Sequence, residues 1–189
     1  SSGVQMSIAF NACYSLETIT IPNTYLVTTF SSCFSNCQSL KTINWTPGAQ
    51  NSLQSLNSAF SNCLLLSTIP IPTSMNSLND MTGAFSSCRS ITTLAFPASL
   101  NSVNALTNTF SSMQKLQSIT LPTSMSACAS FAGTFSDCRM LRTITMPATV
   151  SASTTTFQNC FQNCSSLRTV TLPSVNQLSL VTSIQGTFA

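Results

Sequence analysis

Short segments of alternating apolar and polar residues recur along the whole chain. In the segment 141–147, Leu141, Ile144 and Met146 are apolar, whereas Thr143 and Thr145 are polar. This alternation with period 2, rich in β-branched residues, predicts a half-buried β-strand with the apolar residues facing inward and the threonines facing outward. We expect the strand to end at Pro147, because proline has no N–H group to donate to a central ladder.

The alternating segment belongs to a repeat of about 25 residues, which also holds a phenylalanine and, three residues later, a thiol. Met113 takes the thiol position in one copy. The phenylalanines are Phe10, Phe34, Phe60, Phe85, Phe110, Phe135, Phe161 and Phe188, and the thiols are Cys13, Cys37, Cys63, Cys88, Cys138 and Cys164. The predicted strands lie near 16–22, 40–47, 66–72, 91–97, 116–122, 141–147 and 167–173.

The segment around each phenylalanine is short and rich in small polar residues. It predicts a tight turn or a single helical turn that places the phenylalanine and the thiol on one buried side. Gly83, Gly133 and Gly186 each lie two residues before a phenylalanine, where a positive φ angle suits glycine.

A single unit of this length cannot bury its apolar face alone, whereas stacked units can. We therefore expect a repeat solenoid with one parallel β-strand per turn, neighbouring strands about 4.8 Å apart. No linker interrupts the repeat, so residues 1–189 are expected to form one solenoid of about seven repeats, with no separate globular domain. Equivalent residues of successive turns then form columns of phenylalanine, of thiols and of outward-facing threonine.

The segment from Ala9 to Pro22 resembles the BspA-like leucine-rich repeat of the Treponema pallidum type, with the pattern AF-x-x-C-x-x-L-x-x-I-x-[IL]-P. Residues 59–72 and 134–147 match almost as well, and the resemblance covers essentially the entire chain. It departs in length, because those repeats usually have about 23 residues. The resemblance implies a leucine-rich-repeat solenoid of the kind found on surface proteins of bacteria, parasitic protists and viruses. There it serves adhesion or protein binding, and the family has no shared catalytic residues.

The composition argues against several classes of function. Charged residues make up only 5% of the chain, the net charge is +3 and histidine is absent. This charge is too small for binding driven by nucleic-acid phosphates, and few groups remain for acid–base catalysis. No apolar stretch is long enough to predict a transmembrane helix. We therefore expect no enzyme, no cofactor, no nucleic-acid partner and no membrane insertion.

The nine cysteines allow three sharper hypotheses: disulfides, a metal site or a reactive nucleophile. A metal site is disfavoured because the chain lacks histidine and any C-x-x-C motif. Side chains in register point the same way, and Met113 substitutes for a thiol, so we expect free buried thiols that act as small apolar residues. Cys33, Cys128 and Cys160 lie outside the thiol column, and their disulfide state and reactivity stay open.

The outward-facing threonines and two arginines form the predicted binding face. It consists of Thr18, Thr20, Thr143, Thr145, Thr169, Thr171, Arg142 and Arg168. The first hypothesis for function is an adhesive module, extracellular or on a cell or virion surface, that binds a protein or glycan partner. Ice binding is a remote alternative, because Asn44, Pro70 and Ala95 interrupt the second threonine column.

The second hypothesis is a self-assembling subunit of a virion, filament or surface layer, which binds copies of itself. Neither end of the sequence shows the atypical polar repeat that usually caps a solenoid. We therefore expect either an excerpt of a longer repeat protein or ends that neighbouring subunits cover. The scarcity of charge favours such close packing, because like-charge repulsion would not oppose it.

Overall fold

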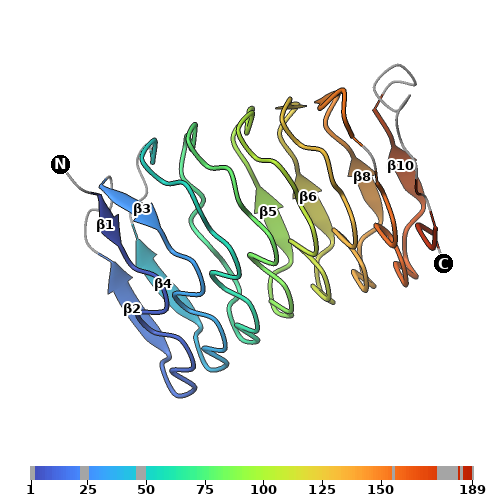
Figure 1. The fold of residues 1–189 in the computed structure, drawn as a ribbon. Coiled ribbons are helices and arrows are strands. Elements are labelled where there is room, and N and C mark those ends of the chain that lie inside the picture. Colours follow the sequence, from blue (N-terminus) through green and yellow to red (C-terminus); the bar gives the residue numbers. More distant parts are fainter. Residues whose placement is uncertain are drawn as a thin grey trace.

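The protein is a parallel β-solenoid in which each repeat forms one turn (Figure 1). A computed structural model describes residues 3–21, 26–45, 50–154, 156–173, 183 and 185–188. The turns follow one another in chain order, with the two termini at opposite ends of the molecule. Within these residues there is no helix, so the segments around the phenylalanines are tight turns and not helical turns. The expected solenoid of the leucine-rich-repeat type is confirmed.

All strands are short and pair in parallel. The strands are β1 Val4–Gln5, β2 Thr18–Ile21, β3 Val27–Thr29, β4 Thr42–Trp45, β5 Thr93–Ala95, β6 Ser118–Thr120, β7 Ser124–Met125, β8 Thr143–Thr145, β9 Thr149–Val150 and β10 Thr169–Thr171. β2, β4, β5, β6, β8 and β10 lie in one row and form the strand face (Figure 1). The hydrogen-bonded pairs are β2–β4, β5–β6, β8–β10, β1–β3 and β7–β9. The strand face is therefore a series of pairs and not one continuous sheet.

The segment 66–72 forms no strand, contrary to the expectation from its sequence. Pro70 occupies the position that Ala95, Thr120 and Thr145 hold in β5, β6 and β8. Proline has no N–H group for the ladder, so the hydrogen bond that this position would donate to a neighbouring turn is missing. The prolines expected to end the first two strands, Pro22 and Pro47, lie outside the described residues.

The phenylalanines form one continuous stack along the solenoid. From Phe10 to Phe188, successive ring centroids lie 5.4–5.8 Å apart and the ring planes differ by at most 16°. Offset stacking at this spacing is favourable beyond the burial of apolar area. The rings from Phe34 to Phe161 are buried, so the stack is the centre of the core.

The thiols beside this stack are hydrogen-bond donors as well as apolar filling. The Sγ atoms of Cys37, Cys63, Cys88, Cys138 and Cys164 each lie 3.0–3.1 Å from the carbonyl oxygen of the phenylalanine in the preceding turn. Each thiol thus links its turn to the one before. Met113 is also fully buried in this column.

Cys33, Cys128 and Cys160 lie in the core as well, and all nine cysteines are free thiols. Cys33 and Cys160 each precede a stacked phenylalanine, where other turns have Ala or Thr. At this position the hydroxyl of Thr134 donates to the carbonyl of Leu106 at 2.9 Å. Small side chains are needed here because the neighbouring turn packs directly against them.

Each turn bends at two residues with left-handed backbone conformation, one two residues before the phenylalanine and one two residues after it. Gly83, Gly133 and Gly186 occupy the first position with φ angles of 60–64°, as expected from the sequence. Asn and Ser residues fill most of the other positions, because they tolerate this conformation better than other residues. Ile8 is the exception, since it is β-branched and has a φ angle of 53°.

Replacement of Ile8 by glycine is therefore expected to stabilise the protein. A non-glycine residue in this conformation costs about 1–2 kcal/mol, and glycine removes most of that cost. Little burial is lost, because the Ile8 side chain is 65% exposed. We expect a gain of about 1 kcal/mol in the free energy of unfolding, measured by urea titration.

The matched control is Ala9→Gly, at an exposed neighbour that is not among the residues with positive φ. Glycine there adds conformational entropy to the unfolded chain without relieving strain, so Ala9→Gly should lower stability. If both variants lost stability equally, Ile8 would not be strained.

Candidate interaction surface

The strand face presents a row of exposed hydroxyl groups. Thr143 and Thr145 of β8 lie directly beside Thr169 and Thr171 of β10. All four side chains are exposed, whereas Ile144 between them is only 3% exposed. The alternation of the sequence therefore places these threonines at the surface and the aliphatic residues in the core.

The predicted binding face is not one site. Thr18 and Thr20 of β2 lie at the N-terminal end of the solenoid, where they pair with Thr42 and Asn44 of β4. β8 and β10 lie at the opposite end, several turns away (Figure 1). The structure thus brings the C-terminal threonines together with Arg142 and Arg168 and leaves Thr18 and Thr20 apart from them.

The strand face opens between β6 and β8. These two strands belong to neighbouring turns, yet they are not hydrogen-bonded to each other. The carbonyl of Thr92 accepts bonds from Gln117 and Ser118 in the next turn, and the carbonyl of Arg142 accepts bonds from Arg168 and Thr169. In the described residues no equivalent pair of bonds reaches the carbonyl of Gln117.

A hollow of about 340 Å³ occupies this opening. Its rim carries the exposed hydroxyl groups of Ser118, Thr120, Thr143 and Thr145. Apolar side chains line the rest, and those of Ile119, Leu121, Ile144 and Met146 are 3–8% exposed. A polar rim over an apolar base is typical of a surface that accepts a partner side chain or a small polar ligand.

Sequence reasoning missed Ser118 and Thr120 as site residues. Their repeat has the usual length and the usual alternation, so nothing in its spacing marks an interruption of the ladder. The opening depends on how far apart two backbones lie, which the identity of the strand residues does not reveal.

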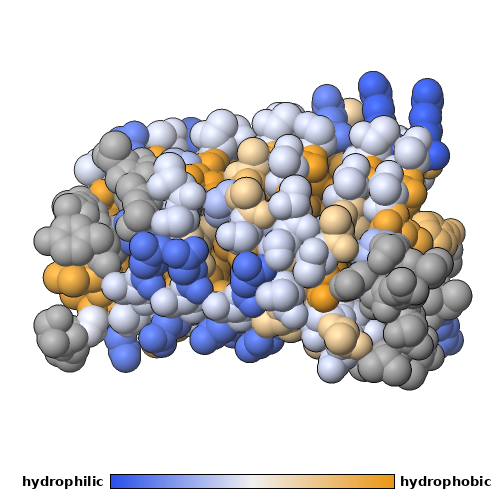
Figure 2. All heavy atoms as spheres, turned by 90° about the horizontal axis from the view of Figure 1, so that it is seen from above, coloured by the Kyte–Doolittle hydropathy of each residue, from blue (hydrophilic) through white to orange (hydrophobic). Residues whose placement is uncertain are grey.

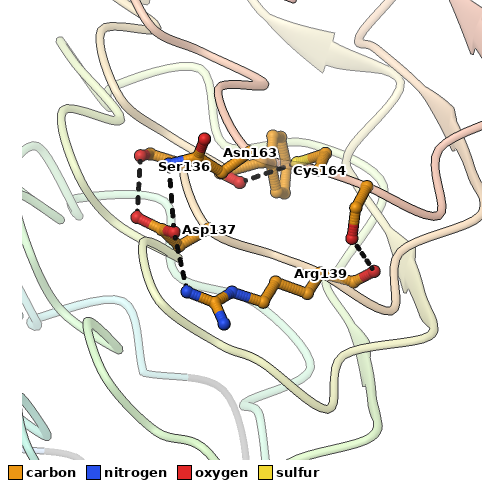
Figure 3. Close-up of polar contacts among 7 residues, drawn as sticks. Ser136, Asp137, Arg139, Asn163 and Cys164 are labelled. Carbon is orange, nitrogen blue, oxygen red and sulfur yellow. Dashed lines mark hydrogen bonds and ion pairs between the residues drawn. The ribbon is translucent and has the colours of Figure 1, made fainter. Parts of the chain in front are cut away.

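The two predicted arginines lie next to each other at the start of β8 and β10. The N–H group of Arg168 donates to the carbonyl of Arg142 at 2.8 Å, and both side chains are exposed. Asp137 lies in the turn before β8, and its carboxylate is held by three neighbours (Figure 3). It accepts bonds from Asn163 at 3.2 Å and Ser136 at 3.5 Å, and Arg139 lies 3.6 Å away. The carboxylate is therefore engaged within the protein, and its pairing with the mostly exposed Arg139 contributes little to stability.

The described residues include no group of three or more His, Cys, Asp or Glu side chains that could hold a metal ion. They also include no helix long and apolar enough to cross a membrane. Burial raises the pKa of Cys33, Cys88 and Cys128 to about 12, so these thiols stay protonated at neutral pH. A protonated buried thiol is a poor nucleophile.

Comparisons with known proteins agree with this architecture. A family model described as "BspA type Leucine rich repeat region" matches residues 6–82 and 81–186, in six copies. The comparison with curated proteins found no match.

A solved structure shows the same type of fold. A leucine-rich repeat protein from Bacteroides ovatus is similar, with a TM-score of 0.68 and 23% identity over 90% of this chain. This chain spans 41% of the length of that protein. Weaker similarity links it to the T. pallidum leucine-rich repeat protein, with a TM-score of 0.46 and 20% identity over 91% of this chain and 64% of that protein. A leucine-rich cell surface protein from Faecalibacterium prausnitzii has a TM-score of 0.41 and 20% identity over 98% of this chain and 67% of that protein.

Proposed function

Because the chain belongs to the family of BspA-type leucine-rich repeats, we propose that it is a non-enzymatic interaction module that binds a protein partner at a cell surface. The opening between β6 and β8 carries this proposal, since it combines exposed hydroxyl groups, an apolar base and an interrupted ladder. A partner side chain that enters the opening buries apolar area and finds hydrogen-bonding groups at its rim. Such a central buried contact is what most protein interfaces depend on.

The location and adhesive role rest on the family alone. Leucine-rich-repeat solenoids of this type act through their surfaces, and the strand face here is exposed along its whole described length. Few charges lie on this face, namely the Glu17–Lys41 ion pair at its N-terminal end and Arg142 and Arg168 at its C-terminal end, which suits a partner bound mainly by apolar contacts and neutral hydrogen bonds.

Changes at the rim of the opening test this surface. We expect the double variant Thr120→Glu, Thr145→Glu to bind a protein partner about tenfold more weakly, since two carboxylates would be desolvated at the interface. The partner is first identified from a panel of purified extracellular proteins by surface plasmon resonance, and the dissociation constant is then compared between variants. Both positions are exposed, so the variant should fold normally.

The control is Ala152→Glu, which adds one negative charge, half of that in the double variant, at an exposed position away from the strand face. Equal loss in both variants, or no loss in the double variant, would contradict the assignment of the opening. Light scattering provides the second comparison. If the particle size grows with protein concentration, and grows equally in the double variant, the result would support the self-assembling subunit instead.

A further inference from the structure

All six basic residues lie in equivalent corners of the solenoid, and the five from Arg89 onward, which are separate from the Glu17–Lys41 ion pair, are here called the basic edge. It comprises Arg89, Lys115, Arg139, Arg142 and Arg168, and all five side chains are exposed. Each lies four to seven residues after a stacked phenylalanine, in the corner that leads from the tight turn into the strand face. Long hydrophilic side chains project from one edge of the molecule at its C-terminal end (Figure 2).

Backbone contacts hold this corner in register between turns. Ser166 donates to the carbonyl of Arg139 at 3.2 Å, and Gln117 donates to the carbonyl of Thr92 at 2.8 Å. Arg142 and Arg168 hold the same repeat position in adjacent turns, and Arg89 and Arg139 hold another, two turns apart, so the basic residues form a staggered row along the solenoid axis over four consecutive turns. With a spacing of about 4.8 Å between turns, the row is roughly 15 Å long.

The positive charge of the basic edge is not balanced within the protein. The chain has three acidic residues, and Glu17 pairs with Lys41 at 2.9 Å near the N-terminus. Asp80 accepts a bond from Asn57, and Asp137 lies beside Arg139. Within the described part of the chain, Arg89, Lys115, Arg142 and Arg168 have no carboxylate at ion-pair distance. A row of unpaired cations on an otherwise nearly uncharged surface attracts anions.

We propose that the basic edge binds a linear acidic polysaccharide laid along the solenoid axis. This inference goes beyond the proposed protein-binding function, since it concerns a different class of ligand and the cations beside the strand face, whereas Ser118 and Thr143 border both surfaces. Such a chain carries one carboxylate or sulfate for every one or two sugars, a spacing of the same order as one or two turns. The cations would bind these groups, with guanidinium favoured for planar carboxylate and sulfate oxygens.

The neighbouring residues favour a sugar chain over other polyanions. Hydroxyl groups of Thr143, Thr169 and Ser118 lie next to the basic edge and suit the hydroxyl groups of sugars. A single-stranded nucleic acid would need aromatic side chains for base stacking, and the basic edge has none.

Binding to defined polyanions tests the proposal. The probes are polygalacturonate, which is carboxylated, heparin, which is sulfated, poly-L-glutamate and a single-stranded oligothymidylate, measured by isothermal titration calorimetry. We expect binding to at least one polysaccharide, with an affinity that falls at least about tenfold between roughly 50 and 200 mM salt. Preference for polygalacturonate or for heparin would identify the anionic group, and either supports the proposal.

A quadruple variant removes the charge: Arg89→Gln, Lys115→Gln, Arg142→Gln, Arg168→Gln. We expect this variant to bind the polysaccharide at least about tenfold more weakly and to lose most of the salt dependence of binding. The matched control is Lys41→Gln, which removes a cation that Glu17 already neutralises and should bind normally. The proposal is overturned if neither polysaccharide binds at low salt, or if the two variants bind equally. It is also overturned if poly-L-glutamate or the oligothymidylate binds as tightly as the polysaccharides. Circular dichroism of each variant checks that the solenoid is intact.

Discussion

Raising the pH above 9 is expected to unfold this protein steeply, because its buried thiols cannot ionise in place. Burial raises the pKa of Cys33, Cys88 and Cys128 to about 12 and raises that of Cys63, Cys138 and Cys160 well above the ordinary value of 9.0. All six side chains are 0% exposed. In the unfolded chain the same thiols lose their protons near pH 9. The unfolded state then binds fewer protons than the folded state, so stability is complete below pH 9 and falls as the pH rises toward 12.

The expected loss is large because the six contributions add. One thiol that ionises only in the unfolded chain costs about 1.4 kcal/mol for each pH unit above its unfolded pKa. For six thiols the free energy of unfolding should fall by about 8 kcal/mol between roughly pH 8 and pH 10, which is as much as the total stability of many domains. Urea titrations at several pH values, in oxygen-free buffer with a reducing agent, measure this loss.

Single substitutions show whether the thiols cause the loss. Cys88→Ala and Cys138→Ala should each reduce it by about 1.4 kcal/mol, whatever their effect on stability at neutral pH. Ser86→Ala, beside the same column, removes no ionisable group and should leave the pH dependence unchanged. A free energy of unfolding that stays constant from pH 8 to pH 10 would contradict the burial of these thiols.

Removal of one ring from the phenylalanine stack is expected to have the second largest effect. The Phe110 ring is 1% exposed and stacks at 5.8 Å on Phe85 and at 5.4 Å on Phe135. Phe96 packs against it at 5.7 Å with a tilt of 59°. Phe110→Ala should lower the free energy of unfolding by about 3–5 kcal/mol, because it leaves a cavity between two turns. In a solenoid each turn is stabilised by its neighbours, so the cavity also weakens the coupling between the two halves.

Phe188→Ala is the matched control for this prediction. The Phe188 ring is 66% exposed and, among the described residues, stacks only on Phe161, at 5.6 Å. We expect it to cost less than about 1 kcal/mol, since little apolar area returns to water. Urea unfolding followed by circular dichroism compares the two variants, and Phe110→Leu should fall between them. Similar losses in both alanine variants would show that the stack does not determine stability.

Most of what the sequence reveals about the fold comes from the repeat. Proline recurs every 25 or 26 residues and phenylalanine every 24 to 27, so the solenoid and the positions of most strands follow from spacing alone. The alternation within residues 141–147 correctly separates exposed Thr143 and Thr145 from buried Ile144. Pro70 shows the limit of this reasoning. Its turn fits the repeat in length, but it lacks one N–H group for the ladder and forms no strand.

The candidate site was less accessible to sequence reasoning. The identity of Arg142 and Arg168 as neighbours follows from the repeat, and Thr18 and Thr143 lie on the same strand face but several turns apart. The sequence also does not reveal that the cysteines of the thiol column donate hydrogen bonds to phenylalanine carbonyls. Met113 fits the same position, so the sequence pattern indicates only that an apolar side chain is buried there.

The sequence by itself thus determined which residues of this protein are buried and which turns carry positive charge. Burial and the position of the charges both follow from a local sequence pattern, and its repetition places equivalent residues beside one another in successive turns. Only the tertiary structure decided where the strand face is joined and where it opens between β6 and β8. Hydrogen bonds between turns require two backbones to approach within about 3 Å. That approach depends on the packing of every side chain around both turns and not on the strand residues alone.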